Sequence, residues 1–144
     1  MLAHVAAAEA VRRARLPWHD GRMDYSAVPS GIFTSPEIGC GACRSAGFRG
    51  GPRCAYGHVP DARTRQGAGH ERTPPHVQDR FDGATGKVLG VHIAGAHATD
   101  LIAEAGLALR LGASVRDIAA TIHAHPTLAE GLYEAALSLV EAGG

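Results

Sequence analysis

Residues 82–94 read Asp-Gly-Ala-Thr-Gly-Lys-Val-Leu-Gly-Val-His-Ile-Ala. One Asp and two Gly within the first five positions are typical of a turn, and the β-branched apolar run from Val88 to Ala94 is typical of a strand. A turn directly before a strand indicates a hairpin, so we expect a partner strand near Phe81. The middle of the chain is therefore predicted to contain an antiparallel pair.

Three amphipathic helices are predicted after this hairpin. The first is expected to end at Gly112, the second to open at Ser114 with Asp117 three residues later, and the third to open at Thr127 with Glu130 three residues later. Their apolar faces are formed by Leu101, Ala105, Ala108 and Leu109, by Val115, Ile118, Ala119 and Ile122, and by Leu132, Ala136, Leu139 and Val140. Helices laid on an antiparallel sheet give the fold class α+β, with the helices on one face of the sheet.

The N-terminal part is predicted to hold one helix and one strand. Residues 2–14 are rich in alanine with a helical pattern, which Pro17 ends. Val28 to Gly39 is expected to form one extended strand, with Pro29 and Pro36 near its ends because proline cannot donate to a sheet ladder.

Composition excludes several classes of protein. The 144 residues include 14 basic and 14 acidic side chains, so no bulk charge favours a nucleic acid or a membrane surface. We find no apolar run of membrane-spanning length and no leader-like N-terminus, and we expect a cytoplasmic location. Three cysteines, an odd number, do not suggest a disulfide scaffold.

Residues 123–130 read His-Ala-His-Pro-Thr-Leu-Ala-Glu. A carboxylate that hydrogen-bonds one nitrogen of an imidazole fixes its tautomer and leaves the other nitrogen to exchange a proton. His125 and Glu130 are therefore a candidate catalytic pair for thiol chemistry. A plainer reading is also open: Glu130 can be the carboxylate of a capping box with Thr127, and the two roles can coexist. We interpret His123 as structural.

This octapeptide resembles the C-terminal signature of the pyridine nucleotide-disulfide oxidoreductases, most closely the dihydrolipoamide dehydrogenases. Two further stretches, Tyr25–Cys40 and Thr85–Glu104, are similar to the dimerisation domain of that family in the expected order. The first residues, Met1, Leu2, Ala3 and His4, are similar to the segment that lines the flavin at the end of the family's FAD domain.

The resemblance implies a mechanism and a set of partners. Dihydrolipoamide reduces an active-site disulfide, His125 takes the thiol proton while Glu130 orients it, and electrons pass through FAD to NAD+. In the family the histidine serves the other subunit, which implies a homodimer or a full-length homologue as partner, and the substrate is carried on a lipoamide-bearing acyltransferase.

Length limits what this chain can do alone. It has no Gly-x-Gly-x-x-Gly fingerprint and no Cys-x4-Cys, and 144 residues hold about one domain. We interpret residues 1–24 as a remnant of the FAD-domain helix and linker, and 25–144 as the dimerisation domain. No FAD or NAD is expected to bind the chain alone, which we expect to be inactive. The alternative is a non-enzymatic remnant that docks on a homologue.

Residues 41–80 break the pattern. They contain seven Arg, seven Gly and four Pro but no Leu or Ile, so we expect an irregular insert. Back-translation of His58–Glu71 with permissible codons, read one base later, can give a sequence similar to what the family carries there. We therefore interpret about 41–79 as a frameshifted segment, with the frame restored before Phe81.

The same interval permits a rival interpretation as a zinc-binding interaction module. Cys40, Cys43, Cys54 and His58 supply four ligands at spacings compatible with a structural zinc site. The frameshift hypothesis opposes it, because three of these four residues would then be accidental, and we predict no metal site.

Overall fold

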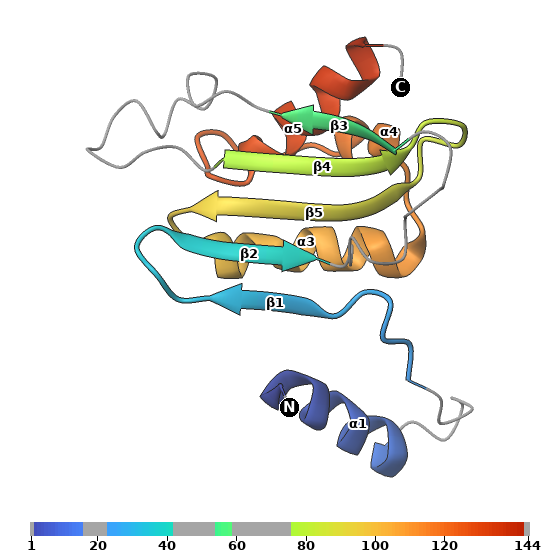
Figure 1. Ribbon diagram of the computed structural model, residues 1–144, viewed down its shortest axis with the longest axis vertical. Helices are drawn as coiled ribbons and strands as arrows, with labels where there is room; N and C mark the ends of the chain where they lie inside the picture. The colour runs from blue at the N-terminus through green and yellow to red at the C-terminus, as the bar shows by residue number, and fades with distance from the viewer. Residues whose placement is uncertain (1, 16–22, 42–53, 59–75, 143–144) are drawn as a thin grey trace.

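The computed structural model describes residues 2–15, 23–41, 54–58 and 76–142. Its elements are α1 (Ala3–Arg15), β1 (Pro29–Ile32), β2 (Glu37–Gly41), β3 (Cys54–His58), β4 (His76–Asp82), β5 (Val88–Gly95), α3 (Ala98–Leu111), α4 (Val115–Ala120) and α5 (Glu130–Glu141). The strands form one antiparallel sheet in the order β1-β2-β5-β4-β3. Figure 1 shows α3, α4 and α5 on one face of this sheet, which confirms the predicted α+β class.

The β4–β5 hairpin follows the turn chemistry of its sequence. The Asp82 side chain accepts hydrogen bonds from the N–H groups of Ala84 (2.8 Å) and Thr85 (3.3 Å), and the Gly86 N–H donates to the Asp82 carbonyl (2.7 Å). Gly86 has φ 69°, a left-handed conformation that glycine adopts without a steric cost. The predicted turn and the predicted partner strand near Phe81 are both confirmed.

The prediction of one strand from Val28 to Gly39 is wrong. This stretch forms two strands, β1 and β2, which pair antiparallel with Ile32 opposite Ile38. Pro36 lies in the turn between them, after a cis peptide bond, and the Thr34 hydroxyl donates to its carbonyl (2.7 Å). Pro29 begins β1 at the edge of the sheet, where a missing N–H costs no ladder bond.

The expectation of an irregular segment over 41–80 is also wrong in part. β2 reaches Gly41, β3 spans Cys54–His58, and β4 begins at His76 and pairs with β3. Ladder hydrogen bonds use only main-chain groups, so pairing with β4 can form a strand from residues that lack an apolar pattern. The remainder of that interval, 42–53 and 59–75, lies outside the described residues.

The first two C-terminal helices end and begin where their caps predict. Gly112 closes α3 with φ 66°, and its N–H donates to the Leu109 carbonyl (3.1 Å). Ser114 and Asp117 form the predicted capping box at α4, with the Ser114 N–H 2.7 Å from Asp117 Oδ2. Ile122 was predicted to continue the apolar stripe of α4 but lies beyond the helix and is 97% exposed.

The third helix begins later than predicted. α5 starts at Glu130, and the Thr127 hydroxyl donates to the Ala124 carbonyl (2.7 Å) instead of capping the helix. Only half of the expected capping box is present, because Glu130 Oε2 accepts from the Thr127 N–H (2.8 Å).

The core lies between the sheet and its helices. α3 packs on β1, β2 and β5, and α5 packs on β3 and β4. The Cβ that any other residue would place at Gly39 would lie 2.3 Å from the Ala98 carbonyl oxygen, so glycine is needed where β2 meets α3. The buried apolar residues are Val77, Phe81, Val88, Val91, Ile93, Ala98, Ile102, Ala105, Ala108, Val115, Ile118, Leu132, Ala135, Ala136 and Leu139.

α1 confirms the predicted N-terminal helix and lies beside β1, away from the three other helices (Figure 1). Hydrogen bonds between described residues join it to the following chain, among them that of the Tyr25 hydroxyl to Glu9 (2.6 Å) and that between His4 Nε2 and the Pro29 carbonyl (2.9 Å). Across the described ranges, no helix has both the length and the apolar character needed to cross a bilayer.

Candidate functional site

His125 and Glu130 lie together at the entry to α5, as their sequence spacing predicts. The His125 Nδ1 is 2.7 Å from Glu130 Oε1. The His125 side chain is 56% exposed and the Glu130 side chain 20% exposed. No described residue bonds the Nε2 of His125, so the ring presents this nitrogen to the surroundings while the other is held by the carboxylate.

The environment of Glu130 keeps its carboxylate ionised. The hydrogen bond from His125 and then the bond from the Thr127 N–H lower the pKa of Glu130 below its usual 4.5. An ionised carboxylate can only accept, so the His125 Nδ1 carries a proton and donates it. A neutral ring then has its lone pair on Nε2, the nitrogen that can accept a proton.

The turn that carries His125 is closed by short-range contacts. The peptide bond between His125 and Pro126 is cis, and the Thr127 hydroxyl bonds the Ala124 carbonyl across it. Ala124, His125 and Pro126 are all exposed. The turn therefore places the imidazole at the protein surface.

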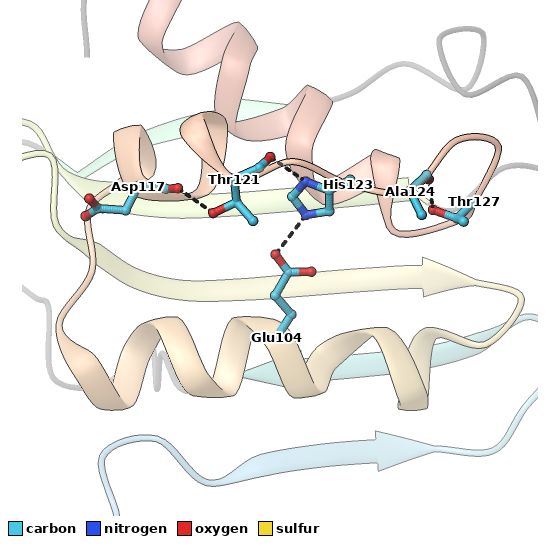
Figure 2. A network of polar contacts seen from close by, with 6 residues as sticks. All are labelled: Glu104, Asp117, Thr121, His123, Ala124 and Thr127. Atoms are coloured by element: carbon cyan, nitrogen blue, oxygen red, sulfur yellow. Dashed lines mark hydrogen bonds and ion pairs between the residues drawn. The ribbon is translucent and has the colours of Figure 1, made fainter.

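A second His–Glu pair involves His123, the residue directly before this turn in the chain. The His123 Nε2 is 2.8 Å from Glu104 Oε1, and its Nδ1 is 3.0 Å from the Thr121 carbonyl. Figure 2 shows the Glu104 side chain extending from α3 to the His123 ring. The sequence could not indicate this pair, because Glu104 is on α3 and His123 follows α4, and only the tertiary fold brings the two together.

The residues predicted to bind the cofactor lie at the start of α1. Met1 is outside the described residues, whereas Leu2, Ala3 and His4 are exposed. The first turn of α1 carries no acidic side chain. These residues offer a small apolar surface and an imidazole, which suit contact with a ring system, and they are separate from the His125 turn.

The sheet contradicts the zinc alternative. Cys40 is on β2 and Cys54 on β3, and two strands lie between them, so the two main chains are about 14 Å apart. Cys54 and His58 are at opposite ends of β3, about 13 Å apart. Zinc ligands bind at about 2.0–2.3 Å, so these residues cannot share one ion. Cys43 lies outside the described residues.

Asp79 is a polar residue that the sequence did not single out. It faces the core from β4 with no exposed surface, and neither carboxylate oxygen has a hydrogen-bond partner in the described structure. Burial, and then the nearby charge of Glu104, raise the pKa of Asp79 to about 7. Its position in the β3–β4 part of the sheet makes it a feature of the core and not of the His125 turn.

Comparison with known proteins finds dihydrolipoyl dehydrogenases among the relatives of this chain. Dihydrolipoyl dehydrogenase from Halobacterium salinarum is 38% identical over 143 residues, and that from Haloferax volcanii is 38% identical over 138 residues. Each match covers 94% of this chain but 29% of the relative, so the chain spans less than a third of the length of these proteins.

Solved structures share the fold. LpdA from Mycobacterium tuberculosis matches with a TM-score of 0.73 and 23% identity, over 81% of this chain and 26% of that one. The flavoprotein disulfide reductase RclA from Escherichia coli, as its Cu(II) complex, matches with a TM-score of 0.76 and 17% identity, over 92% of this chain and 31% of that one. The family model described as "Pyridine nucleotide-disulphide oxidoreductase, dimerisation domain" matches residues 28–136. Most of the chain is thus accounted for by this domain, and the chain belongs to the pyridine nucleotide-disulphide oxidoreductase family.

Proposed function

We propose that this chain is the interface domain of a dihydrolipoyl dehydrogenase-like flavoprotein, which oxidises dihydrolipoamide with NAD+, and that His125 and Glu130 are its proton-transfer pair. One observation carries the proposal: Glu130 holds Nδ1 of an exposed imidazole at 2.7 Å and leaves Nε2 available. Dihydrolipoamide loses two electrons and two protons as its disulfide forms. A base at Nε2 can remove a thiol proton and leave the thiolate that attacks sulfur.

Glu130 supports each half of this proton transfer. Its carboxylate holds the neutral ring in the tautomer that accepts at Nε2, and it stabilises the imidazolium once the proton has arrived. Its own bond from the Thr127 N–H fixes the carboxylate in place. The pair can therefore take a proton and return it without a change of geometry.

The exposure of the His125 ring fits a base that acts on a second subunit. We propose that the domain pairs with a second copy or with a full-length homologue, and that Nε2 approaches the redox disulfide of that partner. In this arrangement a lipoamide-bearing acyltransferase presents the substrate. The interface domain is then catalytic as well as structural.

We infer that residues 1–24 belong to the end of a flavin domain and residues 25–144 to the interface domain. Leu2, Ala3 and His4, with Met1, would then contact the flavin. FAD, when bound, carries the electrons from the dithiol to NAD+. The sequence of this chain has no Gly-x-Gly-x-x-Gly fingerprint for the phosphates of a dinucleotide, so neither FAD nor NAD is expected to bind it alone.

A hybrid enzyme tests the proposal. The corresponding C-terminal part of the Halobacterium salinarum relative is replaced by this chain with the reading frame of residues 41–79 corrected, and lipoamide-dependent NADH formation is measured. His125→Gln should reduce the rate of the proton-coupled half reaction by ~10²–10⁴-fold without changing flavin content. Full turnover in this variant would refute the assignment of His125.

Asp79 favours a second candidate function, a non-enzymatic remnant that only docks on a homologue. A buried carboxylate without a partner is costly to the fold and has no part in the proposed chemistry. It is the kind of defect that an out-of-frame segment would introduce into a domain that no longer catalyses a reaction. If the hybrid binds its partner subunit and flavin but the unsubstituted tail gives no turnover, this second function is the correct one.

A further inference from the structure

The imidazole of His123 is held at both of its nitrogens, two residues before His125. Nε2 faces Glu104 Oε1 at 2.8 Å and Nδ1 faces the Thr121 carbonyl oxygen at 3.0 Å. The His123 side chain is only 6% exposed, and its ring lies against that of Tyr133 with centroids 5.7 Å apart. The ring is therefore fixed in position, orientation and hydrogen bonding.

Both hydrogen-bond contacts of the His123 ring are to oxygen atoms. A backbone carbonyl only accepts, so Nδ1 donates to Thr121. Nε2 is occupied by Glu104, so neither ring nitrogen is left to exchange a proton with another molecule, which separates the role of His123 from that of His125.

His123 joins the segment that carries His125 to α3. Figure 2 shows this network: the Thr121 hydroxyl, just after α4, donates to the Asp117 carbonyl within that helix (2.8 Å), and Thr127 closes the turn on Ala124. Glu104 reaches across to the same segment from α3. The exposed His125 turn thus begins at a residue that is anchored to a different helix.

We propose that His123 is a positioning residue: its bond to Glu104 holds the segment 121–127 so that His125 stays against Glu130. The inference rests on the proposed function, because it assigns His123 a role through His125. A catalytic base has to be held to within about 0.5 Å of its productive geometry, and an exposed turn has few apolar contacts with which to do this. A charge-assisted bond from a buried ring supplies that restraint.

The test uses the full 144-residue chain and NMR spectra of its histidine rings. In the unsubstituted chain, His123 should show a proton on Nδ1 held by the Thr121 carbonyl, and His125 should show one on Nδ1 held by Glu130. His123→Phe removes both hydrogen bonds of the ring but keeps an aromatic ring beside Tyr133. Exchange of the Thr127 amide should become at least ~10-fold faster in this variant. The Nδ1 proton of His125 should also lose its distinct signal.

The expected change must not reflect general unfolding, so the amides of β5 serve as the internal reference. Their exchange should stay unchanged in His123→Phe. Glu104→Gln keeps an acceptor oxygen for Nε2 and should preserve the His125 signal, whereas Glu104→Leu should abolish it. Glu141→Gln, an exposed carboxylate at the end of α5, is the matched control and should change neither. The Glu104 pair decides the matter if His123→Phe fails to fold.

Unchanged Thr127 exchange and an unchanged His125 signal in both His123→Phe and Glu104→Leu would overturn the inference. The hybrid enzyme separates this failure from that of the proposed function. If His125→Gln reduces turnover but His123→Phe does not, His125 is the base and the positioning role is wrong. If His125→Gln has no effect, the proposed function itself is wrong, whatever the spectra show.

Discussion

Replacement of Asp79 by asparagine should make the protein more stable at pH 8. The Asp79 carboxyl group is fully buried on β4, both of its oxygens lack a partner in the described structure, and its pKa is raised from 3.8 to about 7. The folded protein therefore binds a proton that the unfolded chain releases between about pH 4 and pH 7. The contribution of Asp79 to stability is largest below this window and falls as the pH rises through it.

The size of the effect follows from the pKa. A tenfold change in proton affinity corresponds to about 1.4 kcal/mol, so the full window corresponds to about 4 kcal/mol and the part above pH 5 to about 3 kcal/mol. Small domains have unfolding free energies of about 5–15 kcal/mol, so this loss is a large share. Asparagine has the size of aspartate but no titrating group, and Asp79→Asn should remove the loss.

Urea unfolding at about pH 5 and pH 8 measures this directly. The unsubstituted chain should lose about 3 kcal/mol between the two conditions relative to Asp79→Asn. Glu141→Gln, which removes an exposed carboxylate, should follow the unsubstituted chain at both. If the difference between the chain and Asp79→Asn were the same at the two pH values, the raised pKa of Asp79 would be refuted.

Two further outcomes follow from the described contacts. Gly39→Ala should lower the unfolding free energy by about 1–3 kcal/mol, because the new Cβ would lie 2.3 Å from the Ala98 carbonyl oxygen. Gly106→Ala on α3 should raise it by about 0.5–1 kcal/mol, because no atom lies within 4 Å of the new Cβ. Equal effects of the two substitutions in thermal unfolding would contradict the close approach at Gly39. The hydrogen bonds that lower the pKa of Glu130 should be lost as the pH falls through that lowered pKa, so exchange of the Thr127 amide should become faster in acid and not at neutral pH. Glu130→Gln should remove this dependence, and a Thr127 exchange rate that does not respond to acid would contradict it.

The sequence predicts those parts of the fold that depend on local chemistry. The turn after Asp82, the capping box at Ser114 and the C-cap at Gly112 each need only residues a few positions apart, and all are present. The His125–Glu130 contact was found for the same reason, since a turn and the start of one helix bring the two side chains together.

The parts that were missed depend on tertiary contacts. β3 has no apolar pattern and is defined by its pairing with β4. The division of 28–39 into β1 and β2 depends on a turn at Pro36 that the extended pattern concealed. The bond between His123 and Glu104 joins the segment after α4 to α3. Asp79 is buried because its side chain lies on the face of β4 that α5 covers, which the sequence alone does not indicate.

The position of Asp79 also bears on the proposed frameshift. Val77, Asp79 and Phe81 alternate along β4 and all face the core, so an apolar residue is expected at each. Phe81 follows the point where the frame is proposed to be restored, and Asp79 precedes it. Main-chain pairing tolerates an arbitrary sequence, which explains why β3 and the start of β4 form, but a core position does not. Asp79 is the last core position before the point where the frame is proposed to be restored. A carboxylate without a partner at this position is therefore the defect that an out-of-frame segment would introduce. Translation of codons 40–82 in the shifted frame should place an apolar residue there, and a polar residue at that position in both frames would remove this support for the frameshift.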